Sequence, residues 1–156
     1  MIRLKTGALA ALAAYTGMRA TGKNHEESKA LASLFEGMGV GFQILDDVKN
    51  ISAGNAGKKR GDDIVEGKKS LPAILHIEKC PADAASLTAY FEQARREGID
   101  SSAVEKAIAL LSSSGSIAEA EKRGRGAVDS VLEHLNARYG NAAREIFERL
   151  FCYMQV

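Results

Sequence analysis

The sequence predicts an all-α protein, and three observations support this. Alanine, leucine, glutamate, lysine and arginine are abundant, and these are strong helix formers. Only two prolines interrupt 156 residues. Short clusters rich in glycine and serine separate the remaining segments, as helix ends require. With 46% hydrophobic residues, the composition is typical of an ordinary soluble globular protein that buries a single core.

The first half of the chain is expected to contain two helices and a loop. The first helix runs from Ile2 to Met18 and ends near Gly22 and Asn24, which are stop and cap signals. The second, from about Glu26 to Ile51, is the longest. The stretch from Ser52 to Lys69 holds four glycines and is expected to form a loop.

The second half is expected to be helical throughout. A short helix ends before Pro81, and glycine or serine clusters separate the helices that follow. No internal repeat or domain boundary is found, so we expect residues 1–156 to form one domain. The predicted helices of this half are Leu71–Lys79, Ala82–Glu97, Ser101–Ser113, Ser116–Tyr139 and Ala142–Tyr153.

Charge and cysteine content exclude several classes of protein. The formal net charge is +1, which argues against a general nucleic-acid-binding protein. Cys80 and Cys152 are too few and too far apart to indicate a disulfide framework or a zinc site. Such cysteine usage is typical of a reducing compartment, and we expect a cytoplasmic protein.

The N-terminal segment allows two interpretations. Arg3 and Lys5 precede an apolar stretch from Gly7 to Ala14, a pattern that fits a secretory signal. The longest uncharged run, Thr6 to Met18, is well short of the roughly 20 residues that span a bilayer. The alternative, which we prefer, is a buried alanine-rich helix that packs closely against its neighbours.

The long second helix carries one polar stripe. At 100° per residue, one arc of roughly 100° on this helix carries the polar residues Gln43, Asp46, Asp47 and Asn50. Most of the remaining helix surface is apolar. Such a helix is expected to be buried, with its stripe facing a cavity or a wet cleft. Two adjacent carboxylates there repel each other and cost several kcal/mol to desolvate, so a cation must compensate them.

Magnesium and a diphosphate fit this pattern. Oxygen ligands without nearby histidine or cysteine favour Mg²⁺, which often bridges carboxylates to phosphates. Lysine and arginine residues of the following loop can donate to phosphate oxygens. Alternatively, the aspartates form a solvated face or an ion pair, and the charge run is merely solvated. A second acidic cluster, Asp62, Asp63 and Glu66, is interpreted as the start of a short helical turn.

Several motifs resemble one known family. "FQILDDVKN", followed by "GKKRGDDIVEGKKSLP", is similar to the second aspartate-rich region of the trans-isoprenyl diphosphate synthases, the polyprenyl synthetase family. "KTG" at Lys5 to Gly7 resembles the Lys-Thr motif of the same family. The resemblance covers Lys5 to Pro72 and implies the C-terminal part of the isoprenoid synthase fold, a helical bundle. It also favours a pocket-lining N-terminal helix over a secretory signal.

The resemblance implies prenyl transfer. Family members condense an allylic diphosphate with isopentenyl diphosphate, head to tail, with the help of magnesium ions. The implied residues form three groups: magnesium ligands, lysines that hold the allylic diphosphate, and residues at the reacting end. The magnesium ligands would be Asp46, Asp47 and Asn50. The allylic diphosphate would be held by Lys5, Lys58 and Lys68, and the residues at the reacting end would be Lys5, Thr6 and Gln43.

Two departures from the family pattern change what is expected. Asn50 stands where an aspartate is usual, although some geranylgeranyl diphosphate synthases also carry asparagine there. The first aspartate-rich motif and the isopentenyl diphosphate site lie upstream of the Lys-Thr motif in the family. We therefore expect the C-terminal half of a geranylgeranyl- or farnesyl-type synthase, inactive alone.

Three interpretations of such a chain remain open. The first is a portion of an enzyme: a fragment, a proteolysed product, or one half of a split synthase whose other half is a separate chain. The expected partners are a homo-oligomer or a second chain that supplies the N-terminal half. The second is a non-catalytic regulatory or binding subunit that pairs with a complete synthase. The third is a helical domain with vestigial motifs. An oligomer or partner is expected in each case, because exposed apolar helices need a cover.

Overall fold

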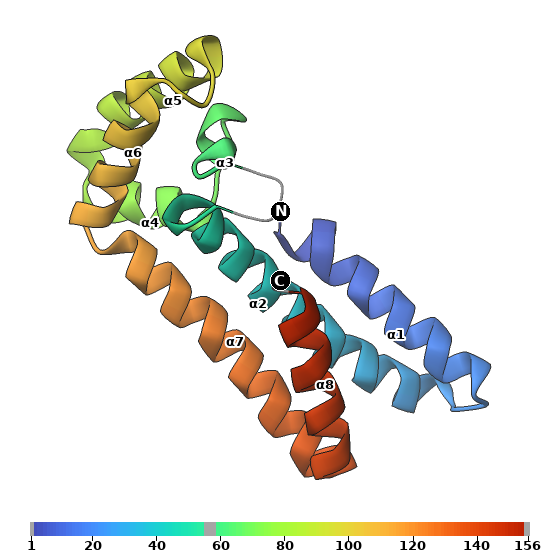
Figure 1. Ribbon diagram of the computed structural model, residues 1–156. Helices are drawn as coiled ribbons and strands as arrows, with labels where there is room; N and C mark the ends of the chain where they lie inside the picture. Colours follow the sequence, from blue (N-terminus) through green and yellow to red (C-terminus); the bar gives the residue numbers. More distant parts are fainter. Residues whose placement is uncertain (1, 55–58, 155–156) are drawn as a thin grey trace. The chain divides into compact units, whose positions relative to one another are not determined.

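The described part of the chain is helical. The computed structural model describes residues 2–54 and 59–154, and within these ranges it contains no strand, so the all-α prediction is confirmed (Figure 1). The first element, η1, is a π-helical turn, and η2 is a 3₁₀-helix. The elements are η1 Arg3–Gly7, α1 Ala8–Ala20, α2 His25–Ser52, α3 Asp62–Val65, α4 Leu71–Lys79, η2 Pro81–Asp83, α5 Ala84–Glu97, α6 Ser102–Ser113, α7 Ser116–Tyr139 and α8 Asn141–Met154.

Most predicted helices agree with the observed bounds to within two residues. The helix Leu71–Lys79 has the predicted bounds, because Pro72 at its second position and Pro81 just beyond its end favour those limits. The short helix α3 lies inside the predicted loop, at the position where a helical turn is expected from its acidic start.

The chain packs as two compact units. Unit 1 comprises residues 1–43 and 123–156, and unit 2 comprises residues 44–122. Helices α2 and α7 each contribute residues to both units. The single domain expected from the sequence stays a prediction.

Unit 2 has an apolar core between its helices. Figure 1 shows α5 and α6 side by side, and both also contact α3. The largest side chains of this core include Ile51 of α2, Ile64 of α3 and Leu111 of α6, all fully buried. Ser101 begins α6 by accepting a hydrogen bond from the Ala103 backbone N–H at 3.2 Å. The core holds the end of α2 and the loop after it against α5 and α6.

Unit 1 is built on close helix contacts along the first part of α2. A Cβ added to Gly39 would lie 3.0 Å from the Cα of Gly7, so glycine lets η1 and α2 approach closely. Toward α8, the ring of Phe35 packs edge-on against Phe147 with centroids 4.6 Å apart. The guanidinium of Arg3 donates to Glu36 at 2.6 and 3.0 Å. These contacts attach η1 and α8 to α2.

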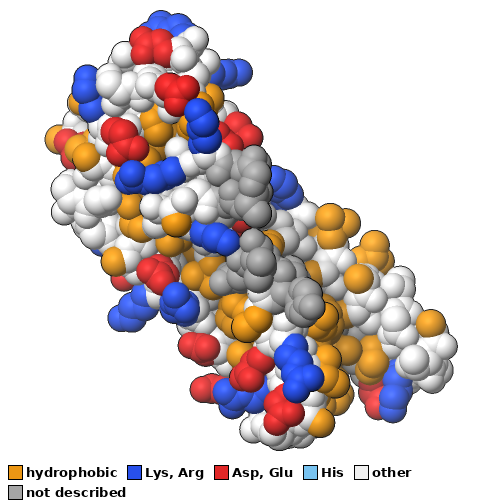
Figure 2. All heavy atoms as spheres, viewed as in Figure 1, with side chains coloured by type: hydrophobic (Ala, Val, Ile, Leu, Met, Phe, Trp, Pro, Cys, Tyr) orange, Lys and Arg blue, Asp and Glu red, His pale blue; other side chains and the backbone are white. Residues whose placement is uncertain are grey.

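Apolar side chains are exposed on the N-terminal elements of unit 1. Leu4 of η1 is 80% exposed, and Leu9 and Leu12 of α1 are also exposed. Figure 2 shows apolar side chains gathered along α1. Among the described residues, no helix combines the length and the apolar character needed to cross a membrane. Contiguous exposed apolar side chains are often covered by a partner protein.

Candidate functional site

A buried cluster of charges lies at the end of α2 in unit 2. The ammonium nitrogen of Lys68 lies 2.7 Å from Asp47 Oδ1 and 2.8 Å from Asp63 Oδ2. Asp47 is only 1% exposed, and Asp63 is also buried. Two carboxylates and one ammonium group carry a net charge of −1 when all are ionised. Lys68 thus bridges two buried carboxylates.

The loop between α2 and α3 is fixed by hydrogen bonds to Asn50. The Gly61 N–H donates to the Asn50 backbone carbonyl at 2.9 Å, and the Asp63 N–H donates to Asn50 Oδ1 at 3.1 Å. Gly61 has φ +89°, and a Cβ there would collide with Val104. Glycine is therefore required at the turn that places Asp63 beside the end of α2.

Lys68 reaches the two aspartates from just beyond α3. Its backbone N–H donates to the Asp63 carbonyl at 2.9 Å, which closes the turn after that helix. Gly67, immediately before it, has φ +70° and permits the reversal. The local turn thus brings the Lys68 side chain back over Asp63 and toward Asp47.

Burial controls the protonation of the cluster. Burial raises the pKa of the Asp63 carboxyl above its ordinary value, and the hydrogen bond from Lys68 opposes that shift without cancelling it. Burial alone would lower the pKa of Lys68, but its hydrogen bonds to Asp47 and Asp63 outweigh burial and raise it. Lys68 is therefore held as a cation between the carboxylates.

A second pair of predicted site residues meets in unit 1. The Thr6 hydroxyl donates to Gln43 Oε1 at 2.8 Å. Thr6 belongs to η1, whose π-helical turn widens the backbone by one residue, and such turns are frequent at functional sites. Gln43 is buried, so its amide is held at a fixed position beside η1. The contact joins the Lys-Thr segment to α2; the role of Thr6 and Gln43 at a reacting end stays a prediction.

The other predicted residues are placed as follows. Lys5 is exposed on η1, one residue before Thr6. Asp46 is half-buried on α2, next to the buried Asp47. Asn50 is buried, and its side-chain oxygen is engaged by the Asp63 N–H. Lys58 lies outside the described residues.

Asp63 is the residue that sequence reasoning missed. It was interpreted only as a carboxylate at a helix start, whereas its side chain is buried and pairs with Lys68. A signal was present, because Asp63 directly precedes the apolar Ile64 and Val65 and stands five residues before a lysine. An aspartate so close to buried residues needs a positive partner.

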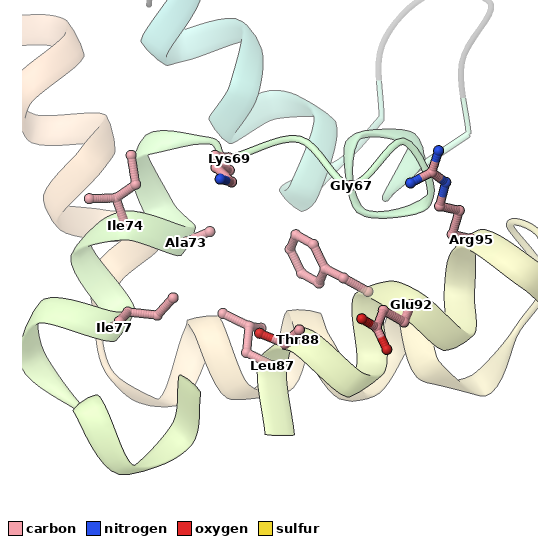
Figure 3. A pocket seen from close by; sticks show the side chains of 10 residues that line it. Gly67, Lys69, Ala73, Ile74, Ile77, Leu87, Thr88, Glu92 and Arg95 are labelled. Atoms are coloured by element: carbon pink, nitrogen blue, oxygen red, sulfur yellow. The ribbon is translucent and has the colours of Figure 1, made fainter. Parts of the chain in front are cut away.

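The apolar pocket of unit 2 is separate from this cluster. It has a volume of about 330 Å³, and Lys69 but neither Asp47 nor Lys68 is among its lining residues. Figure 3 shows Ile77 and Leu87 pointing into the pocket, with Arg95 at one end. This pocket is therefore distinct from the charged cluster, and the charged cluster is the candidate functional site.

Comparison with known proteins identifies the family. Residues 1–111 match the polyprenyl synthetase family. The chain belongs to the polyprenyl synthetase family. The match includes both the Lys-Thr segment and the aspartate cluster, and it extends well past the Lys5–Pro72 stretch in which the sequence motifs are distinctive.

Similar proteins include geranylgeranyl diphosphate synthases and a variediene synthase. The geranylgeranyl pyrophosphate synthase of Geoglobus acetivorans is 42% identical over 80 residues, which cover 51% of this chain and 25% of that protein. The variediene synthase of Aspergillus brasiliensis is 33% identical over 133 residues, or 84% of this chain and 19% of that protein. The chain thus spans less than half the length of these relatives.

Solved structures show the same fold. Geranylgeranyl pyrophosphate synthetase from Pyrococcus horikoshii is 33% identical with a TM-score of 0.78, covering 99% of this chain and 46% of that one. Polyprenyl synthase from Caulobacter crescentus, complexed with calcium and isoprenyl diphosphate, is 29% identical with a TM-score of 0.78, covering 98% of this chain and 47% of that one. The isoprenoid synthase fold implied by the motifs is confirmed for this polyprenyl synthetase chain.

Proposed function

We propose that this chain binds an allylic prenyl diphosphate together with Mg²⁺ at the end of α2, as part of a prenyl-transfer reaction. The observation that carries the proposal is the cluster in which Lys68 contacts the buried carboxylates of Asp47 and Asp63 at 2.7 and 2.8 Å. Carboxylates in a buried position are stable only when cations compensate them, and a bound metal ion is one such cation. Membership of the polyprenyl synthetase family supports the same substrate class.

The donor set fits magnesium. Asp46 and Asp47 offer carboxylate oxygens, which Mg²⁺ prefers, and neither imidazole nor thiolate is among the described partners of Asp47. Asn50 would contribute only if its side-chain oxygen were shared with the Asp63 N–H, which it accepts at 3.1 Å. The Caulobacter crescentus relative, complexed with calcium and isoprenyl diphosphate, supports a divalent cation in the family.

The diphosphate would be held by lysines. Lys68 is the cation beside Asp47, and its ammonium group would donate to a phosphate oxygen held near that carboxylate. Lys5 is exposed and available for the same task, and Lys58 is proposed from the sequence motif alone. Thr6 and Gln43, joined by their 2.8 Å hydrogen bond, would lie toward the reacting end and stabilise charge there by their dipoles.

The proposed reaction is head-to-tail condensation of the allylic diphosphate with isopentenyl diphosphate. Bound magnesium would offset the negative charge that grows on the departing diphosphate. The 156 residues carry the second aspartate-rich region and not the first, so we expect them to bind the allylic substrate without completing the condensation. The remaining groups would come from the N-terminal half of such a synthase, in a second chain or in a longer protein of which these residues are part. We place this activity in the cytoplasm, with which two free cysteines agree.

A second candidate function is a non-catalytic subunit that pairs with a complete prenyl synthase. The exposed leucines of η1 and α1 favour it, since a partner helix would cover them. This candidate requires no diphosphate binding, and that difference separates it from the first.

Titration calorimetry with geranyl or farnesyl diphosphate, with and without magnesium, tests the proposal. We expect binding that depends on magnesium. Asp47→Asn should abolish it while circular dichroism and the melting transition show a folded protein. Asp62→Asn, a half-buried aspartate of α3, is the matched control and should bind normally. Absence of binding by the folded wild-type chain, or unchanged binding by Asp47→Asn, would contradict the proposal.

A further inference from the structure

A second cluster of potential ligands lies at the end of α4, within unit 2. One ligand atom each from His76, Cys80 and Asp83 lie within 4.8 Å of one another. His76 and Cys80 are four residues apart, one helical turn, and the Cys80 N–H donates to the His76 carbonyl at 2.8 Å. The Asp83 N–H donates to the Cys80 carbonyl at 3.0 Å, which folds η2 back beside the helix end. Local backbone structure thus gathers the three side chains.

Hydrogen bonds at Ser114 determine the tautomer of His76. The Ser114 hydroxyl donates to the Leu111 carbonyl at 3.1 Å, so its single proton is used there. His76 Nδ1 lies 2.9 Å from the same hydroxyl oxygen, which therefore accepts from an Nδ1–H group. In the neutral ring, the lone pair is then on Nε2. A histidine so oriented by its other nitrogen is typical of metal ligands.

The Nε2 atom of His76 is buried and faces a carboxylate. The residue is 0% exposed, and Nε2 makes no hydrogen bond within the described part of the chain. Asp83 Oδ2 lies 3.3 Å from it. Two electron-pair donors so close repel each other unless a proton or a metal cation lies between them. The buried His76 Nε2 atom, the half-exposed Asp83 carboxylate and the Cys80 thiol thus face one another, and a metal ion bound between them could be coordinated by all three.

We propose that His76 Nε2, Cys80 Sγ and the Asp83 carboxylate bind Zn²⁺ or a similar transition-metal ion. Imidazole and thiolate ligands select such metals, unlike the all-oxygen donors proposed for magnesium at Asp46 and Asp47. Zinc bonds of about 2.0–2.3 Å place tetrahedral ligands roughly 3.3–3.8 Å apart, so the three groups need to close only slightly. Water would take the fourth position, because Cys80 and Asp83 are only half-buried.

The role of the ion would be structural. Bound metal would link the end of α4 to η2, and the hydrogen bond from His76 to Ser114 extends the link to the end of α6. The two cysteines of the chain are far apart in sequence, so no zinc motif made of cysteine pairs is present. The ligands instead come from three residue types within eight positions. This site is independent of the proposed diphosphate site.

Cobalt(II) is the probe, because a thiolate ligand gives it a charge-transfer absorption in the near ultraviolet. The full chain, stripped of metal with a chelator, is titrated with Co²⁺, and we expect one equivalent to produce that band together with the visible bands of a tetrahedral site. Zn²⁺ should displace the cobalt, and excess Mg²⁺ should not. Cys80→Ser should remove the charge-transfer band, whereas Cys152→Ser, at the exposed cysteine, should keep it.

Cobalt binding by further variants tests which residues form the site. Asp83→Asn should weaken cobalt binding at least about tenfold, and Ser114→Ala about 10- to 100-fold, since it loses the residue that orients His76. Asp47→Asn should bind cobalt normally, which distinguishes this site from the magnesium site. Zn²⁺ should also slow alkylation of Cys80 and not of Cys152. A charge-transfer band that is absent from the folded wild-type chain, or that persists in Cys80→Ser, would overturn the proposal.

Discussion

The ammonium group of Lys68 bridges Asp47 and Asp63, two buried aspartates that stand sixteen positions apart in the sequence. Asp47 lies near the end of the long helix α2, and Asp63 is the second residue of α3. Lys68 therefore joins the two segments that flank the glycine-rich loop, and much of the electrostatics of the site depends on this one side chain.

Replacing Lys68 with methionine should destabilise unit 2. The change keeps most of the side-chain volume and leaves two buried carboxylates without their shared cation, which typically costs about 3–5 kcal/mol. Urea denaturation measures the loss. Lys69→Met, at the exposed neighbour, is the control and should change stability by no more than about 0.5 kcal/mol. Equal stability of the two variants would show that the bridge contributes little.

Stability should also depend on pH through Asp63. Its folded-state pKa is raised by burial above the ordinary value of 3.8, so the folded state keeps a proton that the unfolded state has lost. The free energy of unfolding should therefore decrease as pH rises from 3.8 through the higher folded pKa. Urea midpoints in the presence of a chelator measure this slope. Asp63→Asn should flatten it, whereas Asp62→Asn should keep it; the same slope in both variants would contradict the assignment.

Gly61→Ala should be costly for two reasons. Its φ of +89° is unfavourable for alanine, and the new Cβ would collide with Val104. Together these effects should reduce stability by at least about 2 kcal/mol. Gly67→Ala is the matched comparison, because its φ is +70° and nothing lies within 4 Å of its Cβ position. It should lose only about 1 kcal/mol, and equal losses would argue against the collision.

The exposed leucines should cause association. Leu9 and Leu12 are exposed on α1, and we expect the chain to sediment as an oligomer at micromolar concentration. The double variant Leu9→Lys, Leu12→Lys should shift the distribution to smaller species with unchanged circular dichroism. Ala13→Lys, an exposed position of the same helix, should not. A compact wild-type monomer in analytical ultracentrifugation would refute the prediction.

Helix positions could be predicted closely from the sequence because their limits are local. Pro72 and Pro81 favour the limits of α4, and glycine or serine clusters separate the later helices. The π-helical turn at Arg3–Gly7 could not be predicted in this way. Its form accompanies contacts of Gly7 and Thr6 with α2 residues more than 30 positions away, which no local pattern records.

The site was predictable in its residue types and less so in its pairings. The sequence pattern predicts a cation at the stripe near Asp47, since carboxylates on an apolar helix must be compensated, and the magnesium ion stays a prediction. In the structure Asp47 pairs with Lys68, a residue that the family resemblance implies as a ligand of the diphosphate. Its second contact, Asp63, depends on the turn at Gly61, and only tertiary structure shows that this turn brings Asp63 beside Asn50.

The division of the chain into two units has a consequence for the order of folding. Unit 2 is one continuous segment, residues 44–122, so its contacts close short loops and can form as soon as that segment has been synthesised. Unit 1 joins residues 1–43 to residues 123–156 and must wait for the later segment. During translation the first part of α2, which packs Phe35 against Phe147 of α8 and Gly41 against Val128 of α7, would therefore remain without these neighbours after unit 2 has formed, which makes it a segment in need of a chaperone.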